Sequence, residues 1–316
     1  MGILSSLGLW PGPRAPLDDR LRQAIDRAIE AVDPLLKTVS GHERELAPAV
    51  GHALGYCETL AAEIPGPIDI SAHAFSADPL VHALFATSGD IAEMLARSRE
   101  LRQFLDDPAR CDGDEFFGLL GMRRGEKRVL GASLNGDSVQ NDVLQRLLYF
   151  ADHTLGELGR DGATTRQRFE DAAFDGLVQG FADTVVELRR QRQEASTAWR
   201  LAQAGGGDNI QRLQELEERQ RQATKALAPK SLLGAFVEWL GAPERRLYLK
   251  PTEATVDRMG VMADREAVDA GFRSLRLSEL VGRDRRHWIV LVVRISCAEA
   301  REAVRQQQEG NRYLVI

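Results

Sequence analysis

The sequence contains few cysteines and no cysteine motif. Only three occur among 316 residues, at Cys57, Cys111 and Cys297, and no C-x-x-C pair is present. This spacing encodes neither a disulfide framework nor a thiolate zinc site. We therefore expect reduced thiols. Cys297 falls in the first turn of a predicted helix, but a lone thiol without a nearby base does not make a catalytic nucleophile.

Long hydrophobic runs are also missing. The apolar stretch at the start, MGILSSLGLW, is too short for the core of a signal peptide or for a membrane-spanning helix, and no positive charge precedes it. We expect no secretion and no stable membrane insertion, and hence a cytoplasmic protein.

The common catalytic and ligand-binding motifs are absent. The chain has no P-loop, no G-x-G-x-x-G, no H-E-x-x-H and no G-x-S-x-G. Asp152 and His153 form an adjacent acid–base pair, but no nucleophile accompanies them. We predict neither a metal nor a cofactor, and we expect the protein not to be an enzyme.

An excess of positive charge is missing as well. The net charge is −6 and the pI is about 5.7, which argues against a protein that binds nucleic acid by neutralising phosphates. Arginine outnumbers lysine 36 to 5. We interpret this imbalance as the mark of a GC-rich, bacterial genome and not as a functional signal.

What the sequence does contain predicts an α+β fold. We expect a helical N-terminal region with a small β-meander, a long antiparallel helical hairpin, and a C-terminal antiparallel sheet with one or two helices. The expected boundaries are residues 1–16 for a flexible N-terminal segment, 17–160 for the N-terminal region, 161–241 for the hairpin and 242–316 for the C-terminal region. The two β regions would make the hairpin an insertion if they belonged to one sheet. Asp18 and Asp78 are predicted to cap helices, and Pro34 is predicted to kink or divide one. Pro48 is expected in the first turn of a helix that ends near Ala62, and RYLVI, residues 312–316, is expected to be a final strand.

The strongest pattern lies between Thr164 and Lys230, where apolar residues recur at alternating spacings of four and three, as in a coiled coil. Thr164 and Gln167 form a capping box that predicts the helix start. The glycines at 205–207 allow a sharp reversal, so we expect two antiparallel helices. The apolar side chains predicted to bind a partner are Phe181, Leu188, Trp199, Leu213 and Leu216.

The segment GMRRGEKRVLG, residues 121–131, contains three glycines and a basic cluster. It fails as a phosphate loop because Glu126 follows Gly125 where a P-loop has lysine. We predict an exposed turn between two strands of the meander. Residues 143–155 fit both a helix and a strand pattern, and we favour the strand.

A second candidate site consists of the basic residues of this segment. If the turn lay next to another basic turn at residues 283–286, the side chains could bind an anion or an acidic partner surface. Ordinary solvated loop tips are the competing interpretation. The candidate anion-binding residues are Arg123, Arg124, Lys127, Arg128 and His153.

Two functional hypotheses follow. The favoured one is a cytoplasmic, non-enzymatic interaction or assembly protein that uses the helical hairpin for homo-oligomerisation or for binding a protein partner, with no role for nucleic acid. The alternative is a small-ligand or anion-binding module, or an enzyme, whose site lies near the meander.

Overall fold

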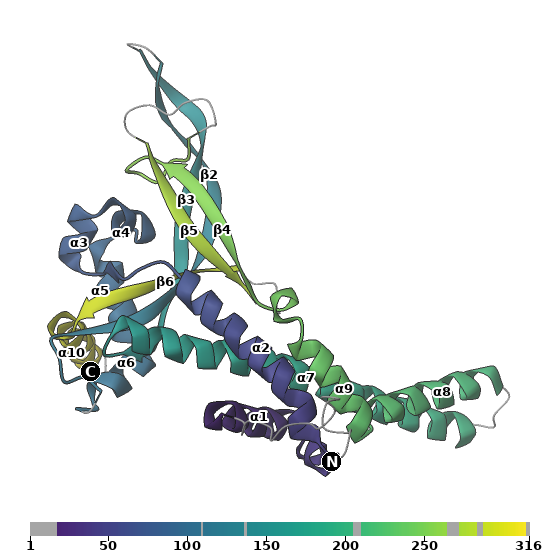
Figure 1. Cartoon of the computed structure of the whole chain (residues 1–316). Coiled ribbons are helices and arrows are strands. Elements are labelled where there is room, and N and C mark those ends of the chain that lie inside the picture. The colour runs from purple at the N-terminus through teal and green to yellow at the C-terminus, as the bar shows by residue number, and fades with distance from the viewer. Residues whose placement is uncertain are drawn as a thin grey trace, which may run out of the picture. The chain divides into compact units, whose positions relative to one another are not determined.

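A computed structural model describes residues 18–108, 110–135, 138–204, 210–263, 272–282 and 287–313. The fold is α+β, as predicted (Figure 1). The chain divides into two compact units, one made of Met1–Ala53 and Val178–Ala242, the other of Leu54–Leu177 and Pro243–Ile316. The segment predicted to be flexible, residues 1–16, and the triple glycine lie outside the described residues.

The first unit is helical. It contains α1 (Asp19–Val32), η1 (Pro34–Thr38), α8 (Ile210–Ala226), α9 (Pro229–Leu240) and parts of α2 (His42–Glu63) and α7 (Gly162–Ala204). Asp18 caps α1, since its side chain accepts from the backbone N–H of Arg20. Pro34 separates α1 from η1, because a proline favours a first helical turn and cannot donate an N–H inside one.

The second unit is built on one sheet. Its strands are β1 (Ile68–Asp69), β2 (Glu115–Asn135), β3 (Ser138–Gly159), β4 (Tyr248–Val256), β5 (Arg273–Val281) and β6 (His287–Ser296). The order is β3-β2-β6-β5-β4, with β1 parallel to β6 and the other neighbours antiparallel. The β segments on either side of the α7/α8 region in sequence therefore share a single sheet.

Helices surround this sheet and complete its core. They are α3 (Ala72–Ala77), α4 (Pro79–Leu84), α5 (Ser88–Arg97), α6 (Arg99–Leu105), α10 (Cys297–Tyr313) and the short η2 (Pro243–Arg245). Strand β6 is the centre of the core, since every residue from Ile289 to Val293 is at most 3% exposed. Because both faces of this strand are buried, its sequence is a continuous apolar run, without the alternation of apolar and polar residues of a strand with one exposed face.

The predicted turn at residues 121–131 is wrong, because the whole segment lies inside β2. Each glycine sits where a side chain of β3 crosses the strand. A Cβ atom on Gly121, Gly125 or Gly131 would lie 3.1, 2.3 or 2.1 Å from the side chains of Thr154, Tyr149 and Gln145, respectively. Glycine in a strand here marks a close approach, not a reversal.

The region predicted to be a β-meander is instead a hairpin of two long strands, β2 and β3. Residues 143–155 are in β3, so the strand prediction for them is confirmed. Only Glu115–Met122 of β2 pairs with β6, while the rest of β2 pairs with β3 alone. The distal parts of β2 and β3 form a two-stranded arm (Figure 1).

Three smaller predictions need correction. Helix α7 begins at Gly162, and the Asp161 carboxylate accepts from the Thr164 N–H at 2.6 Å, so Asp161 supplies the cap instead of Thr164. The expected final strand from Arg312 is helical as far as Tyr313, and the residues after it are outside the described range. Helix α2 runs through Pro48 without a break.

Candidate interaction surface

Helix α7 changes character along its length within the first unit. Val178, Phe181, Ala182 and Val185 are buried, whereas beyond Val185 the only buried residue among those described in α7 is Ala195. Stripes of apolar residues continue past Val185, but no core covers them. The distal half of α7 therefore has an apolar pattern without a corresponding apolar core.

Phe181 belongs to the buried half. Its ring is 4.8 Å from that of Phe236 in a stacked arrangement and 5.6 Å from that of Trp239, both on α9. It is 4% exposed. This side chain packs inside the unit and does not face outward, because α9 returns onto the same stripe of α7.

An ion pair with a buried carboxylate links α7 to the junction between α1 and η1. The Arg189 guanidinium donates from Nη2 to Asp33 Oδ2 at 2.6 Å, and Asp33 Oδ1 accepts from the Leu35 N–H at 2.9 Å. Asp33 is 6% exposed. The carboxylate thus caps η1 and holds the start of the distal half of α7 in place.

The distal half of α7 lies beside α8, because both helices line the same groove (Figure 1). Only residues 205–209 separate the two helices, so helices that lie side by side must run antiparallel. The groove has a volume of about 640 Å³. Its lining is mostly small and apolar: Leu188, Ala195, Ala198, Leu216, Ala223 and Ala226, with Gln191, Glu194, Arg219 and Gln222.

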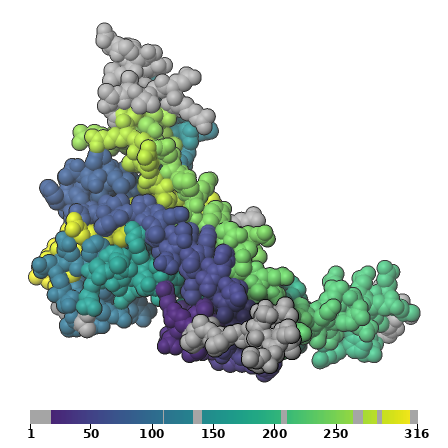
Figure 2. All heavy atoms as spheres, in the orientation of Figure 1, coloured from purple at the N-terminus to yellow at the C-terminus, as the bar shows by residue number. Residues whose placement is uncertain are grey.

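A second groove runs along another side of the same helix pair. Trp199 and Ser196 of α7 line it together with Gln220 and Thr224 of α8. Leu213, the remaining predicted partner-binding residue, is half-buried on α8. Four of the five predicted residues, all except Phe181, therefore lie in this helix pair with part of their surface accessible. The atoms of α8 form an exposed surface in the space-filling view (Figure 2).

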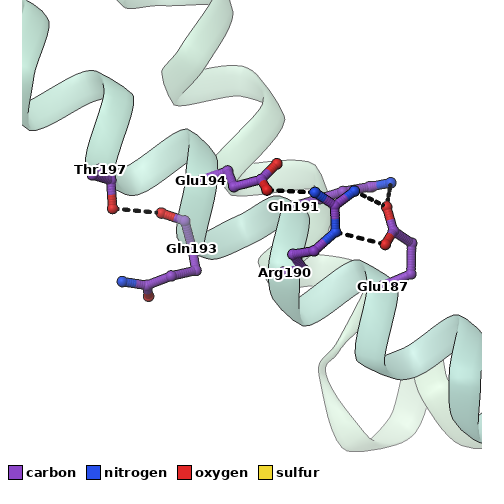
Figure 3. Close-up of polar contacts among 6 residues, drawn as sticks. All are labelled: Glu187, Arg190, Gln191, Gln193, Glu194 and Thr197. Atoms are coloured by element: carbon purple, nitrogen blue, oxygen red, sulfur yellow. Dashed lines mark hydrogen bonds and ion pairs between the residues drawn. The ribbon is translucent and has the colours of Figure 1, made fainter.

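The outer face of α7 is charged and internally paired. Arg190 donates from Nε and Nη2 to the two carboxylate oxygens of Glu187, at 2.8 and 2.6 Å, and also pairs with Glu194 (Figure 3). The hydrogen bonds from Arg190 and then Gln191 lower the pKa of Glu187 to about 2. Glu187 and Arg190 are thus paired with neighbours one turn away on the solvated face of the helix, while Glu194, at the border of this face, also lines the groove.

Three large apolar side chains nevertheless remain exposed on the two helices. Val186, Leu201 and Ile210 are 60%, 69% and 68% exposed. Single exposed apolar residues are common, but here they accompany a groove lined by alanine and leucine. Among the described residues of the first unit, the helix pair therefore carries three exposed large apolar side chains, and Leu35 of η1 is another.

The predicted anion-binding residues do not converge. Consecutive residues of a strand point to opposite faces, so Arg123 and Lys127 lie on one face of β2 while Arg124 and Arg128 lie on the other. The Arg123 guanidinium pairs with Asp152 at 3.3 Å, and Lys127 Nζ lies 5.7 Å from the centre of the Tyr149 ring.

On the second face of β2, the positive charge of Arg124 is also paired with a carboxylate. Arg124 pairs with Glu126 at 2.8 Å and donates to Thr252 Oγ1 at 2.8 Å. His153 is engaged elsewhere: its Nε2 is 2.8 Å from the Leu84 carbonyl oxygen, and its ring stacks on Phe85 at 4.6 Å. The second basic turn, residues 283–286, is outside the described residues.

Comparisons with protein-family models, curated proteins and solved structures find no match to this chain. Among the described residues no three His, Cys, Asp or Glu side chains are grouped so that they could hold a metal ion. Within the same part of the chain, no helix has the length and apolar character needed to cross a membrane.

Proposed function

We propose that this chain is a non-enzymatic assembly protein that associates with a second copy of itself through the α7/α8 helix pair. The supporting observation is the groove lined by Ala195, Ala198, Ala223 and Ala226. Small side chains allow a further helix to approach closely, because the distance between packed helices depends on the side chains at the contact. Leu188 and Leu216 in the same groove supply apolar area for that contact.

The charges of the groove favour a second copy as the occupant. Glu194 comes from α7 and Arg219 from α8, so the surface carries both signs on separate helices. In a two-fold dimer the same surface of both subunits forms the interface, and the two surfaces are related by a rotation of 180°. Glu194 of one copy would then face Arg219 of the other, and such complementarity sets the register.

The test compares two variants of α8. Leu216→Glu places a carboxylate in the groove, whereas Gln214→Glu introduces the same charge at an exposed position that lines neither groove. By light scattering on the full chain, we expect Leu216→Glu to reduce the mass to that of the monomer and Gln214→Glu to leave the dimer. Circular dichroism checks that both variants retain their helix content. Equal masses for the two variants would refute the proposal.

A further inference from the structure

Two of the three cysteines meet in the core of the second unit although 186 residues separate them. Cys111 follows α6, and Cys297 is the first residue of α10. Their sulfur atoms are 3.1 Å apart. The sheet register brings them together, because Glu115 pairs with Ser296 and the Cys297 N–H donates to the Asp114 carbonyl oxygen at 2.8 Å.

The two sulfurs have different surroundings. Arg301, one turn along α10, donates from Nη2 to Cys111 Sγ at 3.4 Å. Burial, together with the hydrogen bond to Cys111, raises the pKa of Cys297 to about 12. Either sulfur can donate in the S–H···S contact, and Cys111 also accepts the hydrogen bond from the Arg301 guanidinium. The thiolate is the nucleophilic form of cysteine, and the sulfur of Cys111 is the one that Arg301 contacts.

We propose that Cys111 and Cys297 are a thiol pair that forms a reversible disulfide on exposure to hydrogen peroxide. The sulfurs must approach by about 1 Å to reach disulfide bonding distance. The two cysteines lie just beyond the Glu115/Ser296 pair that ends the β2/β6 ladder, so a local side-chain movement is sufficient. Cys111 is 8% exposed and Cys297 is 1% exposed, so Cys111 is the more accessible residue of the two.

The reaction balances in two steps. The Cys111 thiolate attacks one peroxide oxygen, the O–O bond breaks, and hydroxide leaves, which gives a sulfenic acid on Cys111. The sulfur of Cys297 then attacks the Cys111 sulfur, the S–S bond forms and the S–O bond breaks. The thiol proton of Cys297 and the protons of the medium convert the departing oxygens to two molecules of water. The thiols lose two electrons and the peroxide gains them.

Cys57 is a matched control within the same unit. It is fully buried, and burial raises its pKa to about 12 as well. It differs in lacking the contacts that Cys111 makes with a second thiol and with Arg301. If burial alone decided the reaction with peroxide, Cys57 and Cys297 would behave alike. The proposed pairing instead predicts that Cys297 forms a disulfide and Cys57 does not.

The experiment treats the full chain with hydrogen peroxide, blocks the remaining thiols with iodoacetamide after denaturation, and maps the peptides by mass spectrometry. We expect one linked pair of peptides containing Cys111 and Cys297, with Cys57 alkylated, and we expect dithiothreitol to release the pair. Cys57→Ser should leave the link intact. In Cys297→Ser, Cys111 should stop at a sulfenic acid that dimedone traps, whereas Cys111→Ser should give much less of that adduct on Cys297.

Other outcomes overturn the inference. If Cys111 and Cys297 are alkylated as fully as Cys57 after peroxide treatment, the pair does not react. If the linked peptides instead join two chains or involve Cys57, the reaction reflects unfolding or random exposure. The peptide map of the wild-type protein, together with its mass on a denaturing non-reducing gel, distinguishes these outcomes, so the test remains valid even where a serine variant folds poorly.

Discussion

Strand β6 and the distal half of α7 both read as apolar patterns in the sequence, but the structure uses them differently. In β6 five consecutive residues are buried between neighbouring strands and helices. In α7 beyond Val185 the apolar residues face α8 across an open groove, and Val186 and Leu201 face outward. A hydrophobic pattern therefore identifies an element, while its packing partners decide whether that element forms core or surface.

The largest expected difference comes from truncating one leucine in each region. Leu291 is fully buried in β6, so Leu291→Ala should lower the free energy of unfolding by about 2–5 kcal/mol. Leu216 is half-buried in the groove, and Leu216→Ala should cost about 1 kcal/mol or less in the monomer. Urea denaturation at low protein concentration measures both. Similar losses would mean that the α7/α8 pair is as tightly packed as the sheet.

A smaller effect is expected where α7 leaves its core. Asp33→Ala removes the cap of η1 and leaves Arg189 without its carboxylate, so it should cost about 1–3 kcal/mol. Glu187→Ala removes a carboxylate from the outer face of the same helix and should change the stability much less. Thermal unfolding followed by circular dichroism compares the two. An equal loss would show that the outer ion pairs hold the helix together.

The smallest effect concerns the β2/β3 arm and depends on pH. Hydrogen bonds from Arg146, and secondarily from Arg124, hold the pKa of Glu126 below its usual range. A lowered pKa in the folded state stabilises the protein above the ordinary carboxyl pKa, and this contribution is lost as the pH falls through the lowered value. Glu126→Gln should therefore destabilise the protein at neutral pH, and the difference from wild type should shrink on acidification.

The loss of stability caused by Glu126→Gln should stay below about 1 kcal/mol, because the Glu126 side chain is 35% exposed and solvent screens the ion pair. A cycle with Arg146→Gln isolates the pairwise contribution, since this change should cost less once Glu126 is already neutral. A difference that grew on acidification would contradict the assigned cause.

Much of the fold could be predicted from the sequence because local patterns determine it. The caps at Asp18 and Asp78, the break at Pro34 and the strand at residues 143–155 all follow from neighbouring residues. The α+β class follows from the change of period along the chain.

The rest depends on contacts between distant segments. The glycines of β2 looked like a turn because the side chains that cover them come from β3. The spacing of Phe181 predicts which face of the helix it lies on. That Phe236 of α9 covers this face is known only from the structure. Cys111 and Cys297 meet through the register of β2 with β6, which no spacing in the sequence reveals.

If the α7/α8 pair binds a second copy of the chain, the mass of the protein in solution must depend on its concentration. Sedimentation equilibrium of the unmodified full chain, across a wide range of concentrations, measures this dependence directly. We expect a reversible increase from the monomer mass of 35.0 kDa to twice that value. A single monomer mass at every concentration would contradict the proposed dimer.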